Sequence, residues 1–301
     1  MTGGGMVPAG PVAWPDGAHA AASFSFDVDA ESAVLSASPA AADRMSVMSH
    51  QAYGPLVGVP RLLDLLDRQG VRATFFVPGY TAHRHPGTVR DIAAAGHEIA
   101  HHGYLHETLV GVSEEEEAAI LDRGLDALEE VAGVRPIGYR APMWELNWHS
   151  PRLLLDRGFR YDSSLMDADA PYELAVDGDG PEGSGSLVEI PIHWGLDDWE
   201  QYCYIPDLSG SGLIESPRKA LEMWTDEFEA LRAAGGCFVL TNHPFLSGRP
   251  ARAAALEELV RSAVEATDVW VASLGEIAEH VRGLGLAPRS ITRPELPEAD
   301  A

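Results

Sequence analysis

Short apolar runs alternate with longer amphipathic segments over most of the chain, and this alternation limits the fold more than any other feature of the sequence. The apolar runs have the length and composition of buried strands, and they lie at residues 22–26, 73–77, 98–100, 137–139, 187–192, 237–240 and 269–271. The intervening segments repeat apolar residues with helical spacing at residues 59–69, 88–95, 113–131, 150–157, 217–234, 251–266 and 274–281. Strands that alternate with helices form a mainly parallel sheet. The sequence therefore predicts an α/β fold, and its seven strands favour a barrel.

One domain is expected over residues 21–285, because α/β barrels of this length bury a single core. Residues 1–20 are rich in Gly, Pro and Ala, and residues 286–301 carry proline and acid without apolar periodicity. We expect both ends to be loosely ordered. The Gly-rich stretch at residues 177–186 predicts a surface loop, or a lid, between a helical segment and a strand.

The charge of the chain limits its partners. Its 301 residues include 21 Lys and Arg against 46 Asp and Glu, a formal charge of -25. Such a surface repels phosphate backbones and anionic lipids, so neither nucleic acid nor a membrane is an expected partner. The first residues lack the basic start and apolar stretch of a secretory signal, which predicts a cytoplasmic protein. The two cysteines, Cys203 and Cys237, form no metal-binding or redox motif.

Two aspartates close the first predicted strand. In SFSFDVDAE, Asp27 and Asp29 are two positions apart, so an extended chain points both side chains to one side. Parallel α/β folds place ligands and catalytic groups at the carboxyl ends of their strands. Paired carboxylates there need a cation or a shared proton, although a D-x-D pair alone also occurs where a strand simply enters a polar loop.

Four histidines surround the third predicted strand, in HEIAHHGYLHE. His102 and His106 have the i, i+4 spacing that would place both imidazoles on one side of a helical turn, ready to share an ion. Two histidines and one carboxylate leave coordination positions open for water and substrate, as a catalytic ion requires. We interpret His97 as a structural residue at the strand start and His101 as a neighbour of the pocket.

Two more polar residues follow later strands. Arg140, in PIGYRAPMWE, follows a short strand, where an arginine pairs with a carboxylate either in a site or in a surface salt bridge. His243, in FVLTNHPF, follows the strand at residues 237–240. Its near-neutral imidazole suits it to act as a general acid.

Together these motifs make the chain resemble the polysaccharide deacetylase family, also called the NodB-homology or carbohydrate esterase 4 family. The resemblance spans residues 22–281 and rests on SFDVDAE, HGYLH, YRAP and TNHP, which are specific as an ordered set. It implies an irregular seven-stranded (β/α) barrel of the NodB-homology type. It also implies a metal-dependent hydrolase that acts on a non-peptide carbon–nitrogen bond.

The resemblance implies a role for each candidate residue. A divalent metal ion, zinc or alternatively cobalt or manganese, would be held by Asp29, His102 and His106. Asp27 would be the catalytic base, Arg140 would keep Asp27 ionised and oriented, and His243 would protonate the leaving nitrogen. The family often places an aspartate beside the catalytic histidine, and the sequence leaves that position open among Asp162, Asp197 and Asp198.

Three functions are compatible with these residues. The first is removal of an N-acetyl group from an amino sugar or related substrate. The second is hydrolysis of a small cyclic imide or ureide, because the variant motifs resemble the subgroup that holds peptidoglycan-deacetylase-like proteins, cyclic imidases and metal-free allantoinases. The third is an inactive carbohydrate-binding protein with stacking surfaces from Trp144, Trp148, Trp194 and Trp199, although pocket wall or core is the plainer role for these side chains. A homo-oligomer is compatible with the surface composition.

Overall fold

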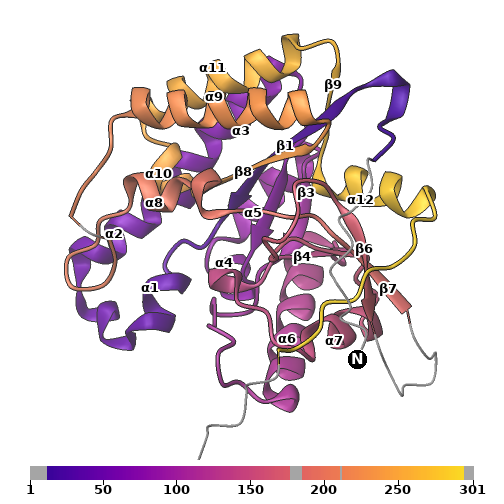
Figure 1. Cartoon of the computed structure of the whole chain (residues 1–301). Coiled ribbons are helices and arrows are strands. Elements are labelled where there is room, and N and C mark those ends of the chain that lie inside the picture. Colours follow the sequence, from indigo (N-terminus) through magenta and orange to yellow (C-terminus); the bar gives the residue numbers. More distant parts are fainter. Residues whose placement is uncertain (1–11, 177–184, 211, 295–301) are drawn as a thin grey trace, which may run out of the picture.

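The computed structural model describes residues 12–176, 185–210 and 212–294, and in it helices cover the outside of one curved sheet (Figure 1). The strands are β1 (Ala20–Asp27), β2 (Thr74–Val77), β3 (Glu98–His101), β4 (Gly138–Tyr139), β5 (Tyr161–Asp162), β6 (Tyr172–Val176), β7 (Gly185–Glu189), β8 (Cys237–Asn242) and β9 (Val269–Val271). The α-helices are α1 (Ser32–Ala37), α2 (Met45–Tyr53), α3 (Val59–Gln69), α4 (Gly79–Arg84), α5 (Pro86–Ala94), α6 (Glu114–Ala132), α7 (Ser150–Asp156), α8 (Asp198–Tyr202), α9 (Pro217–Ala234), α10 (Pro244–Ser247), α11 (Pro250–Glu265) and α12 (Leu274–Gly283).

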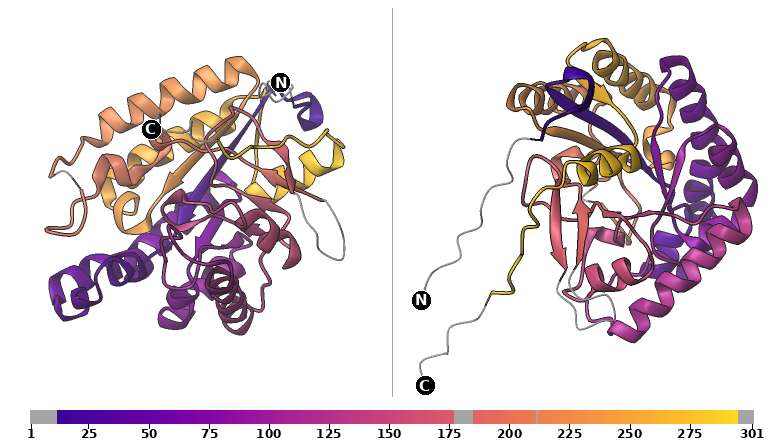
Figure 2. Two further views of the ribbon diagram at one scale, coloured as in Figure 1. Left: turned by 60° about the horizontal axis from the view of Figure 1, so that its bottom comes forward. Right: turned by 90° about the vertical axis from the view of Figure 1, so that its right-hand side faces the viewer.

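The sheet is mainly parallel and is centred on β1. Within the described residues its strands follow the order β6-β7-β5-β4-β3-β2-β1-β8, and β9 pairs with β1. Among the pairs of strands in the described part of the chain, only β6–β7 is antiparallel. The views in Figure 2 show the sheet curling inside a layer of helices. Because the parallel strands all run the same way, the segments that follow β1, β3, β4 and β8 come together at one end of the sheet.

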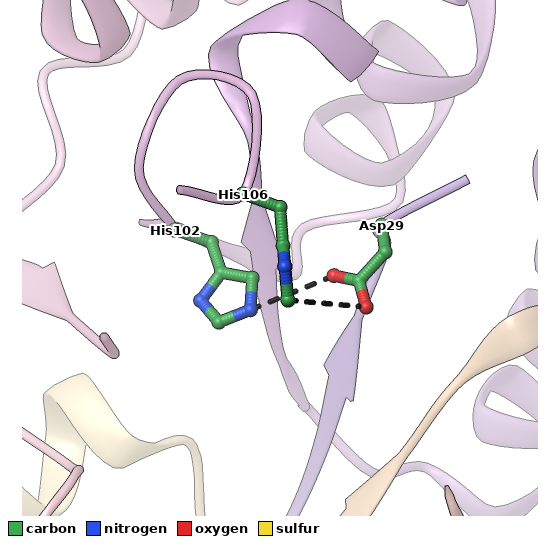
Figure 3. Close-up of side chains that lie close together, drawn as sticks. All are labelled: Asp29, His102 and His106. Atoms are coloured by element: carbon green, nitrogen blue, oxygen red, sulfur yellow. Dashed lines mark ion pairs between the residues drawn. The ribbon is translucent and has the colours of Figure 1, made fainter. Parts of the chain in front are cut away.

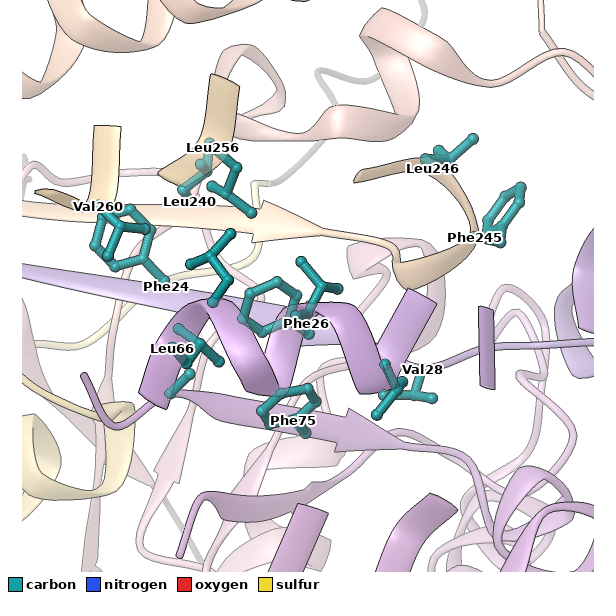
Figure 4. Close-up of a cluster of buried hydrophobic side chains, with 14 of the residues drawn as sticks. Phe24, Phe26, Val28, Leu66, Phe75, Leu240, Phe245, Leu246, Leu256 and Val260 are labelled. Carbon is teal, nitrogen blue, oxygen red and sulfur yellow. The ribbon is translucent and has the colours of Figure 1, made fainter. Parts of the chain in front are cut away.

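Alternation along β1 separates the hydrophobic core from the polar interior. Phe26 stacks on Phe75 with ring centroids 4.8 Å apart, beneath the outer helices. Ser25 and Asp27 therefore face the opposite side. The core cluster that fixes β1 against α3 and α11 is drawn in Figure 4 and includes Phe24, Phe26, Leu66, Leu240, Leu256 and Val260. Truncating one such phenylalanine to alanine costs about 3–5 kcal/mol, so this packing is what holds the end of β1 in place.

A long helical insertion connects β1 to β2 and packs beside the end of β8. It comprises α1, α2, a π-helical turn (Gly54–Gly58) and α3. Gly58 is required at the contact with α10, because a Cβ atom there would lie 2.1 Å from the carbonyl oxygen of Pro244. Pro244 directly follows His243, so this close packing also fixes the position of the histidine.

The structure confirms the predicted α/β fold with a curled, mainly parallel sheet. All seven predicted strands are present, and so are the seven predicted helices, with shifts of a few residues at their ends. A capping box at the start of α6 forms between Ser113 and Glu116. The described residues contain nine strands rather than seven, because β5 has only two residues and β6 joins the sheet as an antiparallel edge.

The Gly-rich stretch and the N-terminal segment differ in part from what the sequence predicts. The stretch at residues 177–186 was expected after a helical segment, but strand β6 precedes it, and positions 177–184 lie outside the described residues. In the N-terminal segment, the described part includes Trp14, which is buried and donates a hydrogen bond from Nε1 to the carbonyl oxygen of Gly235 at 3.1 Å. None of the described helices is both long and apolar enough to cross a membrane.

Candidate active site

A cavity of about 400 Å³ opens at the carboxyl ends of β1, β3 and β8. Its walls include five of the six predicted functional residues: Asp27, Asp29, His102, His106 and His243. The sixth, Arg140, is fully buried behind Asp27 and reaches the site through that carboxylate. Strand ends far apart in the sequence thus bring all six side chains into one place.

Asp29, His102 and His106 form a compact group with the character of a metal site. Nε2 of His102 lies 3.5 Å from Oδ1 of Asp29, and Nε2 of His106 lies 3.5 Å from Oδ2. Figure 3 shows both imidazole rings directed at the carboxylate. Their ligand atoms all lie within 4.8 Å of one another.

The hydrogen bonds around this group also fit a cation. Both carboxylate oxygens of Asp29 are buried, and no donor within the described residues reaches them. A buried carboxylate without donors is costly unless a positive charge neutralises it. Nδ1 of His102 lies 2.7 Å from the carbonyl oxygen of Arg140, which can only accept, so Nδ1 carries the proton and the Nε2 lone pair faces Asp29. Burial lowers the pKa of His102, which favours this neutral form.

The two histidines do not share a helical turn, so that part of the prediction was wrong. They lie in the loop between β3 and α6. Gly103 and His106 have φ angles of 71° and 60°, in the left-handed region that a helix cannot contain. The loop is held instead by Glu107, whose Oε2 accepts hydrogen bonds from the backbone N–H groups of Tyr104 and Leu105 at 3.0 and 2.8 Å.

His101 does not border the cavity, contrary to expectation. Its side chain is fully buried on the other side of β3, where Nε2 donates to the carbonyl oxygen of Leu121 at 3.1 Å. Gly124 makes room for it, because a Cβ atom there would lie 2.1 Å from that nitrogen. Burial lowers the pKa of His101 to about 3, so it is a neutral structural residue. His97 is structural as expected, and its Nδ1 accepts a hydrogen bond from the N–H of Ala73.

Asp27 is held by Arg140. Nη1 of Arg140 donates to Oδ1 of Asp27 at 2.9 Å and to Oγ of Ser25 at 2.9 Å. The other side of the guanidinium is fixed by Ser163, whose carbonyl oxygen and Oγ accept from Nε and Nη2 at 3.1 Å each. Burial would raise the pKa of Asp27, but the charge of Arg140 and the nearby histidines outweigh burial and lower it. The result is an ionised carboxylate whose free Oδ2 lies 3.8 Å from Nε2 of His102.

His243 lies beside Asp29 and is paired with Asp198. Its Nδ1 lies 2.7 Å from Oδ1 of Asp198, and its Nε2 lies 3.5 Å from Oδ2 of Asp29. Asp198 is fixed in turn by the backbone N–H groups of His243 and Ser247 and by the hydroxyl of Ser247. Both oxygens of Asp198 already accept hydrogen bonds from His243 and Ser247. We therefore interpret Asp198 as the partner of the histidine and not as a metal ligand.

The position that the sequence left open is therefore filled by Asp198. Asp197 lies farther away, with Oδ1 3.5 Å from Nδ1 of His243, and Asp162 lies behind Arg140 and does not line the cavity. Burial alone would lower the pKa of His243, but the charge of Asp197 and the hydrogen bond and charge of Asp198 outweigh burial and raise it to about 10. No sequence motif could single out Asp198, because it meets His243 only through the docking of α8 on α10.

Aromatic side chains form one wall of the cavity. Trp144 and Trp194 stack with ring centroids 4.2 Å apart, and Trp199 packs edge-on against His243. These three tryptophans are pocket wall, in line with the plainer of the two interpretations. Trp148 is 55% exposed and does not line this cavity.

Two further segments, which the sequence did not reveal, also line the cavity, and we call them its roof. Helix α1 contributes Val34 and Ala37, and the segment after α8 contributes Leu208. Arg44, at the start of α2, joins the insertion after β1 to the segment after α8, because its Nη2 donates to the carbonyl oxygen of Pro206 at 3.1 Å. The site is therefore a pocket closed on several sides rather than an open groove.

Comparisons with known proteins identify the family of the chain. A sequence model of the family described as polysaccharide deacetylase matches residues 48–161. The peptidoglycan deacetylase of Helicobacter pylori is 31% identical over 277 residues, and the match covers 85% of this chain and 94% of that protein.

Solved structures show the same fold. A protein from Mycobacterium smegmatis described as a polysaccharide deacetylase is 65% identical, with a TM-score of 0.94 over 97% of this chain and 100% of that one. An allantoinase is 27% identical, with a TM-score of 0.76 over 90% of this chain and 92% of that one. Sequence, fold and relatives lead to one conclusion: the chain belongs to the polysaccharide deacetylase family, the carbohydrate esterase 4 hydrolases that cleave amide carbon–nitrogen bonds.

Proposed function

We propose that this protein removes an acetyl group from the nitrogen of an amino sugar or a related amide, using Asp27 as base and His243 as acid. The observation that carries the proposal is the placement of Asp27 and His243 beside the three candidate metal ligands. Oδ2 of Asp27 lies 3.8 Å from Nε2 of His102, and Nε2 of His243 lies 3.5 Å from Oδ2 of Asp29. Each of the two is anchored by a buried partner of opposite charge, Arg140 or Asp198. Hydrolysis of an amide needs both, since water must lose a proton and the leaving nitrogen must gain one.

A divalent ion held by Asp29, His102 and His106 belongs to the proposal. Zinc is the first choice for two imidazoles and one carboxylate, and cobalt or manganese are the alternatives. When bound, the ion supplies Lewis acidity, which lowers the pKa of water and stabilises negative charge on the amide oxygen. The donor-free oxygens of Asp29 support this assignment.

Asp27 takes the proton from the attacking water. Arg140 occupies Oδ1, so Oδ2 is the oxygen left to accept that proton. The lowered pKa of Asp27 keeps it ionised and ready at neutral pH. The oxygen of water then forms a bond to the amide carbon.

His243 donates the proton that releases the nitrogen. Asp198 holds Nδ1, so Nε2, which faces Asp29, is the atom that points to the substrate. The raised pKa of His243 keeps its ring protonated at neutral pH, ready to donate. As the carbon–nitrogen bond breaks, the amine leaves with the proton from Nε2, and acetate remains.

A second candidate is hydrolysis of a small cyclic imide or ureide. The roof formed by α1 and the segment tied down by Arg44 favours it, because a pocket of about 400 Å³ suits a compact ring better than a polymer chain. The allantoinase with the same fold points the same way. The residues that move protons would be the same, since a cyclic amide opens by the same bond cleavage.

One panel separates these candidates. The protein is incubated with N-acetylglucosamine oligomers of increasing length and with succinimide, dihydrouracil and allantoin, each with zinc, cobalt, manganese or chelator, beside Asp27→Asn as control. Acetate release that needs metal and Asp27 supports the deacetylase. Ring opening with the same dependence assigns a cyclic amidohydrolase instead. Binding of sugar without turnover of any amide would leave the inactive carbohydrate-binding protein.

A further inference from the structure

Two buried carboxyl groups lie side by side behind the site. Asp162 and Glu189 are paired residues of the neighbouring parallel strands β5 and β7. Both are fully buried, and neither lines the cavity. The proton transfers described above do not use them.

The hydrogen bonds of the pair show how it is built. Oδ1 of Asp162 accepts from the hydroxyl of Ser164 at 2.8 Å. Oε1 of Glu189 accepts from the backbone N–H groups of Ser164 and Leu165 at 3.2 and 2.9 Å. The remaining oxygens, Oδ2 of Asp162 and Oε2 of Glu189, are buried and receive no hydrogen bond from the described residues, although the two residues are cross-strand neighbours.

A hydrogen bond between the two carboxyl groups would satisfy both unpartnered oxygens, and it requires a proton on one of the groups. Two ionised carboxylates in contact and away from water would repel each other strongly, so one stays protonated. Burial and the neighbouring Asp162 charge hold the pKa of Glu189 well above its usual value. Burial raises the pKa of Asp162 to about 6, which is a smaller change. Glu189 is therefore the neutral donor and Asp162 the anion at neutral pH.

The pair holds the segment that receives Arg140. Ser163 lies between Asp162 and Ser164, and it accepts hydrogen bonds from Nε and Nη2 of Arg140. Ser164 accepts a hydrogen bond from the backbone N–H of Ala141 through its hydroxyl oxygen at 2.9 Å. The guanidinium of Arg140 in turn donates a hydrogen bond to Asp27.

We propose that Asp162 and Glu189 share one proton and act as a positioning pair, which fixes residues 163–165 so that Arg140 holds Asp27 in its working orientation. This role rests on the proposed function, because it assigns the pair to the orientation of the base. Asp162 and Glu189 are positioning residues, since they touch neither the cavity nor the reacting groups.

Substitutions at Glu189 separate positioning from general stability. Glu189→Gln keeps the acceptor for the two backbone N–H groups and offers an amide N–H to Asp162, so kcat should stay within about twofold of the unchanged protein. Glu189→Leu removes both interactions and should lower kcat about 10- to 100-fold with little change in KM, because a misplaced base slows the chemical step. Glu98→Gln is the control, a half-buried carboxylate at the start of β3 that accepts hydrogen bonds from Thr74, Tyr161 and Gly275 but none from residues 163–165.

Two measurements test the pair without any substrate. An infrared difference spectrum between the unchanged protein and Glu189→Gln should contain the C=O stretch of a carboxylic acid. Asp162→Asn should shift the frequency of that stretch, because it changes the hydrogen-bond partner of the acid. Hydrogen exchange at the N–H of Ala141 should speed up in Glu189→Leu but not in Glu189→Gln. These readouts decide the proposal even if no tested amide is hydrolysed, which would count against the proposed function alone.

The proposal is overturned if the infrared difference shows no carboxylic acid, or if Glu189→Leu folds and keeps both its kcat and the slow exchange of Ala141. A loss of kcat in Glu98→Gln equal to that in Glu189→Leu would also overturn it, since the effect would then follow any buried carboxylate.

Discussion

Nδ1 of His243 and Oδ1 of Asp198 lie 2.7 Å apart, and both oxygens of Asp198 are held by further hydrogen bonds from residues 243 and 247. The carboxylate is therefore locked in place before any substrate arrives. Such an arrangement fixes the ring so that Nε2 faces the site, and it stabilises the protonated imidazole.

Asp198→Asn should lower kcat about 10²-fold or more, because an amide cannot stabilise the charged ring of the acid. The metal content should not change, since Asp198 is not one of the three proposed ligands, Asp29, His102 and His106. The measurement is kcat of the metal-loaded variant beside Asp197→Asn, whose longer distance of 3.5 Å predicts a smaller loss. Equal losses in the two variants would contradict the assignment of Asp198 as the partner.

Asp27 and His106 should respond differently to substitution. Asp27→Asn should abolish turnover while the protein still binds metal, because Arg140 rather than the ion holds this residue. His106→Ala should lose both metal and turnover, since it removes one of three ligands. Elemental analysis of dialysed protein checks both expectations. Metal retained at full occupancy by His106→Ala would show that the ion binds elsewhere.

The contacts of Glu31 with Arg84 and His85 should weaken in acid. Oε1 accepts from Nε of Arg84 at 2.9 Å, and Oε2 lies 2.8 Å from Nε2 of His85. Burial would raise the pKa of Glu31, but the hydrogen bonds from His85 and Arg84 outweigh it and lower the pKa to about 2. A lowered carboxyl pKa stabilises the fold fully above the ordinary value of 4.5, and this contribution is lost as the pH falls from there towards 2.

Glu31→Gln should therefore destabilise the protein by about 1–2 kcal/mol at pH 7, after allowance for the exposure of Arg84. The difference in free energy of unfolding between the two proteins should shrink as the pH falls below 4.5. Denaturant unfolding at several pH values measures it. A constant difference across that range would mean that ionisation of Glu31 contributes nothing to the stability.

Arg44 should control access to the pocket. Arg44→Ala removes the hydrogen bond to Pro206 and loosens the roof, which should raise KM for a small substrate about fivefold, the equivalent of one hydrogen bond. Longer N-acetylglucosamine oligomers should gain activity relative to short ones. Asp207→Ala is the control, because this 89% exposed partner of Arg44 should matter little. An unchanged preference for chain length in Arg44→Ala would contradict the role of the roof.

The sequence located the site residues because each follows a buried strand, and parallel strands end together. The same reasoning placed Asp27 and Asp29 on one side of β1 before any contact was known. It could not foresee that the loop from His102 to His106 adopts left-handed backbone angles, because i, i+4 spacing does not distinguish a helix from a loop. The prediction that His101 borders the pocket was wrong because its side chain packs against Gly124, and that contact depends on how α6 docks on β3.

The partners of the site residues were harder to predict than the residues themselves. Asp198 meets His243 across 45 positions, and Arg44 meets Pro206 across 162. Such pairs depend on how short helices pack, and helices as short as α1 and α8 have too little periodicity to be recognised. Strand β5 has only two residues, so the sequence pattern did not reveal it either, nor its pairing of Asp162 with Glu189.

The most direct test of the account measures bound divalent metal and amide hydrolysis on the same preparations of the unchanged protein and Asp27→Asn. We predict a stoichiometric ion in both, turnover in the unchanged protein alone, loss of that turnover with chelator, and its return when metal is restored. Full turnover by a chelated protein free of metal, or a near-normal rate in Asp27→Asn, would contradict the account.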